Sequence, residues 1–257
     1  MARTIPADRF SAVVAASARA FITHGYQRTQ VQDVADALGL AKGTLYGYAQ
    51  GKAALFAAAV RYADGHEPMP SLTDLPVPAP GDGELAALVG GRLAREIAGM
   101  KLAQALVDPM PADATPAEAR AELAGIVTDL FARLARHRIA IKLVDRCAPE
   151  LPDLAELWFG TGRDEQIGAL EQYLLNRERA GTVSLPGPAS LVARTVVELC
   201  AHFAVHCHFD PAPRRMTAAR LGGIDDAVAA ATLAELIVRA TTAPSRASQI
   251  YPPAASE

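Results

Sequence analysis

Residues 29–52 read TQVQDVADALGLAKGTLYGYAQGK and carry the most informative pattern in the sequence. Apolar residues recur there at helical spacing and predict one buried helix face: Val31, Val34, Ala35 and Leu38. Gly39 follows at once, where a helix end favours a residue that tolerates a positive φ. A second short helix is predicted from about Ala41, with Leu45 turned inward. Two short helices joined by a tight turn form a helix-turn-helix, whose second helix meets the base edges of DNA.

The same stretch and its surroundings resemble the DNA-binding domain of the TetR family of transcriptional regulators. The similarity covers roughly residues 1–60, with many positions agreeing in order and spacing. The matching residues are Ala18, Phe21, Gly25, Tyr26, Thr29, Val31, Asp33, Val34, Ala35, Gly39, Lys42, Gly43, Thr44, Leu45, Tyr46, Tyr48, Lys52, Leu55 and Phe56. Three residues depart from the family pattern: Ala41 replaces a usual capping Ser, Ala49 a usual aromatic, and Gly51 a usual Ser or Asn.

The resemblance implies a set of DNA contacts around a second helix that enters the major groove. Lys42 would reach a phosphate or a guanine edge, Gly43 would let the backbone approach closely, and Thr44 would meet a base or a thymine methyl. Tyr46, Tyr48 and Lys52 would bind phosphates, although each tyrosine could instead pack in the core with an exposed hydroxyl. The full predicted set is Arg28, Thr29, Gln30, Lys42, Gly43, Thr44, Tyr46, Tyr48 and Lys52.

The charge is unevenly distributed along the chain. Residues 1–62 hold seven Lys or Arg against three acids, whereas the remainder holds 18 against 25. The net charge of −3 therefore combines a basic first part of +4 with an acidic second part of −7. This asymmetry is consistent with a protein that meets phosphate with one end only, although so small an imbalance also arises by chance.

Length and composition favour a helical protein with a sizeable core. The 257 residues suffice for one large or two small domains, 51% of them are hydrophobic, and only 5% are aromatic. Three scattered cysteines do not form a disulfide framework, which favours a reduced, cytoplasmic setting. The first ten residues lack the apolar run of a signal peptide, and no apolar run of membrane-spanning length is expected.

The first 64 residues are predicted to form a helical DNA-binding domain. One helix is expected over Pro6–His24, a second from Thr29 or Gln30, and another over Lys52–Asp64. Thr29 has a second predicted role as a helix cap. Residues 65–83 contain five prolines and predict a helix-free loop, either a partly mobile connection or a flap over a pocket.

Residues 84–242 are predicted to form a second, larger all-helical domain for regulation and dimerisation. The expected helices cover Glu84–Val107, Thr115 to about Arg146, Asp153–Gly181, Ala189–Phe209 and Asp225–Thr242, and Gly160 and Gly162 could interrupt the third of them. Thr115 and Glu118 flank Pro116 in a capping-box pattern. Residues 243–257 are expected to be disordered. The TetR resemblance implies that the last two helices pair with a second copy in a four-helix bundle.

Other chemistry finds little support in the sequence. His202 and His206 lie four residues apart on one predicted helix and could chelate a metal, but no further ligand is placed to complete a set, so no metal site is predicted. No enzyme motif or cofactor-binding motif occurs, so neither catalysis nor a cofactor is predicted. Six apolar or aromatic residues could line a ligand cavity or belong to the core, and no effector-binding residue is assigned: Met100, Met110, Phe131, Trp158, Phe159 and Tyr173.

Together these patterns predict a transcriptional regulator with an all-α fold. The resemblance implies a repressor that binds a palindromic operator in double-stranded DNA as a homodimer and is released by a small-molecule effector. A metal-sensing regulator using His202 and His206 is a variant of this hypothesis. A helical protein that binds a ligand or partner and has a degenerate DNA-binding head is the alternative, supported only by Ala41, Ala49 and Gly51.

Overall fold

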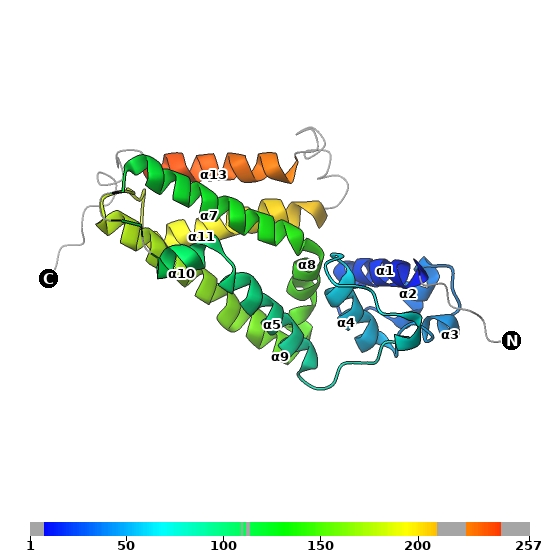
Figure 1. Cartoon of the computed structure of the whole chain (residues 1–257). Coiled ribbons are helices and arrows are strands. Elements are labelled where there is room, and N and C mark those ends of the chain that lie inside the picture. The colour runs from blue at the N-terminus through cyan, green and yellow to red at the C-terminus, as the bar shows by residue number, and fades with distance from the viewer. Residues whose placement is uncertain (1–7, 109, 112–113, 210–224, 243–257) are drawn as a thin grey trace. The chain divides into compact units, whose positions relative to one another are not determined.

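The computed structural model describes residues 8–108, 110–111, 114–209 and 225–242 as helices joined by turns and loops (Figure 1). Within these residues there is no strand, only an isolated bridge between Ala49 and Val77. The predicted all-α fold is therefore confirmed. The expected start of the first helix at Pro6 and the predicted tail 243–257 lie outside the described residues.

The chain divides into two compact units. The first combines Met1–Leu93 with Arg136–Gly162, and the second combines Ala94–Ala135 with Arg163–Glu257. The first unit thus contains the predicted DNA-binding head together with a segment that comes later in the sequence.

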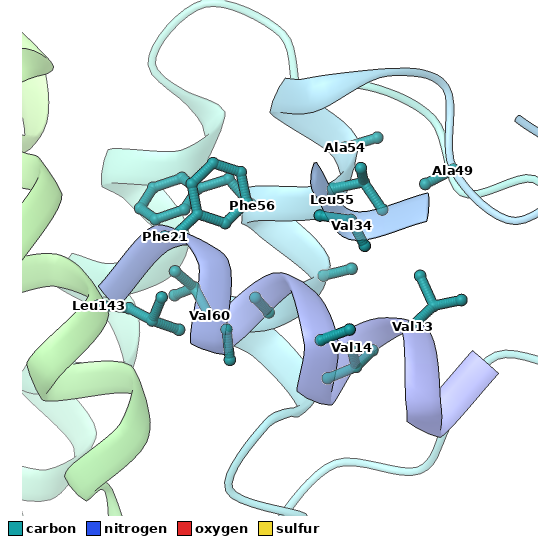
Figure 2. Packing of buried hydrophobic residues seen from close by; sticks show 14 of the residues in the cluster. Val13, Val14, Phe21, Val34, Ala49, Ala54, Leu55, Phe56, Val60 and Leu143 are labelled. Atoms are coloured by element: carbon teal, nitrogen blue, oxygen red, sulfur yellow. The ribbon is translucent and has the colours of Figure 1, made fainter. Parts of the chain in front are cut away.

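Four N-terminal helices form the head of the first unit: α1 (Asp8–His24), α2 (Val31–Ala37), α3 (Lys42–Leu45) and α4 (Lys52–Tyr62). Their apolar faces meet in one core, where Phe21 of α1 packs edge-on against Phe56 of α4 at 5.0 Å between ring centroids (Figure 2). Val13 and Val34 are also fully enclosed there. Because this core fixes α2 and α3 against α1 and α4, it holds the helix-turn-helix in one shape.

Helix α8 (Arg138–Cys147) completes this core, with Leu143 beside Val60 (Figure 2). The α8 N-terminus is capped from a distance, because the Asp64 carboxylate accepts the backbone N–H groups of Ile139 and Ala140 at 2.9 Å each. The 3-10 turn η2 (Ala148–Glu150), the short helix α9 (Pro152–Ala155) and the π-helix η3 (Glu156–Gly162) follow.

The proline-rich segment 65–83 folds back on the head. The backbone N–H of Val77 donates to the Tyr48 carbonyl and its carbonyl accepts from the Gln50 N–H, both at 2.9 Å. The segment was expected to contain no helix, yet it forms one 3-10 turn, η1 (Leu72–Asp74). The turn is possible because the Asp74 carboxylate accepts the backbone N–H of Ser71 at 3.1 Å and caps it.

The second unit is also helical. It contains α6 (Lys101–Val107), most of α7 (Pro116–Arg136), α10 (Arg163–Arg179), α11 (Ala189–Ala204), the 3-10 turn η4 (His206–Phe209) and α13 (Asp226–Thr242). Helix α10 packs against α6 and α11, and α11 packs against α13. An ion pair braces α7 to α10: the Arg177 guanidinium donates to both carboxylate oxygens of Glu122 at 2.8 and 2.9 Å.

Two helices that were predicted as continuous are broken. The expected helix Glu84–Val107 is α5 (Glu84–Ala98) and then α6, because Met100 adopts an extended backbone and Arg133 donates to the carbonyls of Glu96 and Gly99 at the end of α5. The expected helix from Thr115 to about Arg146 is interrupted at His137, where α8 begins under its Asp64 cap.

Two other predicted helix signals are confirmed. The Thr115 N–H donates to the Glu118 carboxylate at 2.7 Å, and the Glu118 N–H donates to the Thr115 hydroxyl at 3.2 Å, so the capping box forms. Helix α10 ends at Arg179, and Gly181 then takes the left-handed conformation at φ +71° that a helix end requires.

Among the described residues, Ala189–Phe209 is long and apolar enough to pass as a membrane span by length and composition. Its regular helix ends at Ala204, however, and its buried side includes Val196 and Cys200 inside the second unit. The exposed side carries the Arg194–Glu198 ion pair at 3.7 Å. Core helices of soluble proteins have this character, so the stretch is weak evidence for a membrane span.

Candidate nucleic-acid interface

The turn between α2 and α3 has the tight geometry that the sequence predicted. Gly39 lies at φ +63°, and nothing approaches the position of a Cβ there, so the backbone angle rather than crowding requires glycine. The Leu40 N–H donates back to the Ala35 carbonyl at 2.9 Å, which closes the end of α2. Ala41 then begins α3 with an extended backbone and no side-chain cap.

Helix α3 is divided sharply into a buried side and an exposed side. Leu45 is fully buried in the core of the first unit. Lys42 and Gly43 are exposed, Tyr46 at the end of α3 is 45% exposed, and Thr44 is half-buried. The structure thus leaves a cation, a bare backbone and a phenol accessible along α3, a combination suited to phosphate and base contacts.

Two of the predicted DNA contacts, Thr29 and Tyr48, are buried side chains in the structure. Thr29 is 1% exposed, and its hydroxyl donates to the Gly25 carbonyl at 2.6 Å, so it ties the α1–α2 connection together. Tyr48 is also 1% exposed, because the returning segment around Val77 pairs with its backbone and the core encloses its ring. The Thr29 hydroxyl is thus engaged within the fold, and the Tyr48 ring packs in the core.

Gln30 and Arg28 are exposed at the start of α2. The Asp33 carboxylate accepts the Gln30 backbone N–H at 2.7 Å, which fixes the first turn of the helix. This capping pattern, in which an acid follows Gln30 by three residues, is visible in the sequence and indicates the start of α2. With Lys42 and Tyr46, these side chains belong to the accessible polar surface of the helix-turn-helix, which also includes Asp33 and Asp36.

Lys52 contributes positive charge to the head and also makes contacts that stabilise its fold. Its ammonium donates to the Gln27 carbonyl at 3.1 Å and lies 4.7 Å from the centroid of the Tyr26 ring. The Tyr26 ring in turn packs against Phe21 and Phe56. Burial raises the pKa of Tyr26, and the nearby Cys147 raises it further, so the phenol stays neutral. Lys52 therefore fixes the α1–α2 connection in the absence of DNA.

Residues from α8 and η2 also reach this connection, and the sequence analysis missed them. The Glu150 carboxylate accepts the Gln27 backbone N–H. The Cys147 thiol lies 3.7 Å from the Phe21 carbonyl. Its pKa is raised to about 12, mainly by burial and further by the charge of Glu150. No local pattern announces contacts between residues more than one hundred positions apart.

The second unit contains a small hollow lined by apolar residues and two polar ones: Met100, Leu130, Leu170, Val197, Asp129 and Gln166. Its volume of about 10 Å³ has room for about one water molecule. Asp129 is already engaged, since it accepts the Lys101 N–H and the Arg133 Nε at 3.0 Å each.

The histidine pattern near the end of α11 does not persist in the structure. Helix α11 ends at Ala204, so His206 lies in the 3-10 turn η4 and does not share a helix face with His202. Within the described residues, no three His, Cys, Asp or Glu side chains gather as metal ligands.

Comparisons with known proteins agree with this geometry. Residues 13–59 match the family model described as bacterial regulatory proteins, tetR family. The ketosteroid transcriptional regulator KstR2 of Mycobacterium tuberculosis matches 92% of this chain and 96% of its own at a TM-score of 0.53 and 14% identity. A tetR-family regulatory protein of Rhodococcus RHA1 matches 92% of this chain and 97% of its own, at a TM-score of 0.48 and 17% identity. FadR of Bacillus subtilis, solved with stearoyl-CoA, matches 90% of this chain and 98% of its own, at a TM-score of 0.42 and 15% identity. No curated protein matches.

Helices α1–α4, with an exposed side on α3, define a helix-turn-helix domain of the kind found in regulators of transcription. Residues 13–59 match the model of such a domain in the TetR family, and the helical fold of the chain is similar to that of KstR2. At this level of identity, the likeness to KstR2 speaks for the fold alone.

Proposed function

We propose that the protein is a DNA-binding transcriptional repressor whose first 64 residues read an operator. The observation that carries this proposal is the exposed side of α3, where Lys42, Gly43 and Tyr46 are accessible on a helix held by its buried Leu45. Helix α3 would enter the major groove, with Lys42 at a phosphate or guanine edge and Thr44 at a base or a thymine methyl. Arg28, Gln30, Tyr46 and Lys52 would hold phosphates.

Exposed apolar residues on α11 and α13 support a homodimer through the last two helices. Leu191 and Phe203 of α11 are 61% and 39% exposed, and Val228 and Leu236 of α13 are 56% and 53% exposed. Pairing these faces between two copies would remove apolar surface from water. Two heads would then read a palindrome, since a two-fold dimer matches two half-sites.

Residues 84–242 would form the regulatory and dimerisation domain, with the segment 65–83 as its connection to the head. A small-molecule effector is typical of the family, and the hollow beside Met100 and Leu170 is the candidate place for it. An organic effector would need this hollow to widen, and it would release DNA by binding the widened state more tightly. We place the protein in the cytoplasm, where its DNA lies.

Selection of bound fragments from random duplex DNA by the purified protein tests this function directly. An enriched palindrome whose affinity falls steeply with salt would establish a dimeric operator-binding protein. Weak binding without sequence preference would contradict it. That outcome would favour the alternative, a helical ligand- or partner-binding protein whose head has lost its DNA-binding role.

A further inference from the structure

The connection between α1 and α2 leads from Gly25 to Gln30 and carries Arg28 on its exposed side. Its ends are closed by short-range hydrogen bonds: the Gly25 N–H donates to the Phe21 carbonyl at 2.8 Å, and the Thr29 hydroxyl donates to the Gly25 carbonyl at 2.6 Å. Between these ends Gln27 is exposed, so core packing does not fix its position.

Charged side chains from two other elements hold the middle of this connection. The Gln27 N–H donates to the Glu150 carboxylate of η2, and the Gln27 carbonyl accepts from the Lys52 ammonium of α4 at 3.1 Å. Hydrogen bonds to charged groups are stronger than neutral ones, so these two contacts are well suited to fix an exposed peptide.

A second observation places Glu150 firmly against the same turn. A Cβ added at Gly25 would lie 2.8 Å from the other carboxylate oxygen of Glu150 and 3.3 Å from the Arg146 guanidinium carbon. The Glu150 side chain therefore spans the turn from Gly25 to Gln27, and the turn has a glycine where the carboxylate approaches. Cys147 and Ala148, both fully buried, anchor the backbone from which Glu150 extends.

We propose that Glu150 is a positioning residue of the DNA interface. Its carboxylate holds Gln27, and through it the direction in which Arg28 and Gln30 leave the connection, without touching DNA itself. The proposal rests on the proposed DNA-binding function and extends it to residues far from the head in sequence. A displacement of η2 against α1 would move the connection, which gives the segment 136–162 a role in DNA affinity.

Electrostatics alone makes the opposite prediction, which gives the proposal a clear test. Removing an acid from the first unit should strengthen binding to a polyanion. Positioning predicts instead that Glu150→Ala weakens operator binding roughly tenfold, the effect of losing one hydrogen bond to a charged group. Glu150→Gln keeps an acceptor of the same length and should bind more tightly than Glu150→Ala. Glu150→Asp keeps the charge but shortens the reach, and it should bind less tightly than wild type.

The experiment uses the full-length protein, operator fragments selected by the wild type, and two measurements. Dissociation constants are compared for wild type, the three Glu150 variants and Glu156→Ala, which removes an exposed acid of η3 in the same unit. Hydrogen exchange at the Gln27 amide is measured without DNA. We expect faster exchange and weaker binding in Glu150→Ala, with Glu156→Ala resembling wild type in both.

Each outcome decides the proposal. Equal or tighter operator binding by Glu150→Ala and Glu150→Asp would overturn it, even if the Gln27 amide exchanged faster. If Glu150→Ala fails to fold, Glu150→Asp carries the test, because it keeps the charge and should still bind operator less tightly than wild type. A wild type that selects no DNA refutes the proposed function before any variant is compared, whereas selected DNA with unaffected Glu150 variants refutes the positioning role alone.

Discussion

The accessible groups on α3 give the DNA-binding proposal its most direct test at the scale of single residues. Lys42→Ala removes an exposed ammonium and should weaken operator binding, with a decrease of about one unit in the slope of log affinity against log salt. Fluorescence anisotropy with the selected operator at several salt concentrations measures both quantities. Arg19→Ala is the matched control, since Arg19 is an exposed cation on α1 outside the predicted contacts. An unchanged slope in Lys42→Ala would remove Lys42 from the interface.

Glu67 makes a second prediction at this scale, concerning stability and pH. Its carboxylate accepts from Arg61 at 2.8 Å and from Arg92, which itself donates to the Val60 carbonyl at the end of α4. Burial raises the pKa of Glu67, but the hydrogen bonds and charges of Arg92 and Arg61 outweigh it, so the pKa lies below the ordinary 4.5. A depressed native pKa stabilises the fold above the unfolded value.

Glu67→Gln should therefore lower the free energy of unfolding at neutral pH, and the difference from wild type should stay constant down to about pH 4.5. Below that it should shrink as pH falls through the depressed native pKa, because the wild type then loses the same charge. Urea unfolding across this range measures the difference. A gap that widens on acidification would contradict the assignment.

The exposed or buried state of single residues was only partly predictable from the sequence. Helical spacing correctly indicated that Leu45 turns inward, which leaves Lys42 and Gly43 outside. Spacing could not show that Tyr48 is enclosed, because part of its cover comes from Val77, twenty-nine positions later and in a segment without periodicity. The local resemblance identified residue types found in DNA-binding domains of the family, but it could not show which distant residues pack on them.

At the scale of elements, the helix starts and stops with local causes were predictable, and the breaks with distant causes were not. Thr115 and Glu118 are neighbours in the sequence, so their capping box could be recognised in advance. The break after α5 depends on Arg133, and the break at His137 is followed by the Asp64 cap. Continuous apolar spacing runs through both breaks, since periodicity reports one face of a helix and not the partners of its backbone.

The brace between α7 and α10 gives a prediction at this scale. Arg177 is 5% exposed, pairs with Glu122, and lies beside Tyr173, whose hydroxyl donates to the same carboxylate at 2.7 Å. Arg177→Ala leaves a largely buried carboxylate without its cation and should lower the free energy of unfolding by roughly 3 kcal/mol. Arg239→Ala breaks an exposed i,i+4 pair with Glu235 and should cost about 0.5 kcal/mol or less.

Urea or thermal unfolding of both variants measures these two free energies. Equal small effects would mean that the Glu122–Arg177 pair contributes no more than a surface ion pair. A large effect of Arg177→Ala that is reproduced by Arg177→Met would locate the contribution in the charge rather than in the packing of the stem, because methionine keeps the apolar part of the side chain.

At the scale of the whole molecule, the organisation differs from a simple succession along the chain. The first unit takes residues 136–162 from a region that the sequence analysis assigned to the second domain. The reason is physical: α8 buries Leu143, Val144 and Cys147 in the same core as α1 and α4. A proline-rich segment after the head suggested a boundary, yet a helix contributed later in the sequence completes the head's core, and such a contact leaves no local signal.

The proposed dimer makes the last prediction, because it concerns two molecules at once. Leu236→Glu places a carboxylate on the exposed side of α13, where Leu236 is 53% exposed, so the isolated protein should fold normally. In a two-fold interface the substitution occurs twice, and burying two unpaired charges should prevent association. Sedimentation should then show monomers, and operator affinity should fall because each head binds only one half-site. Leu72→Glu is the matched control, since Leu72 in η1 is 48% exposed and lies outside the proposed interface. Dimers in Leu236→Glu would place the interface elsewhere, whereas monomers with undiminished operator affinity would contradict the need for two heads.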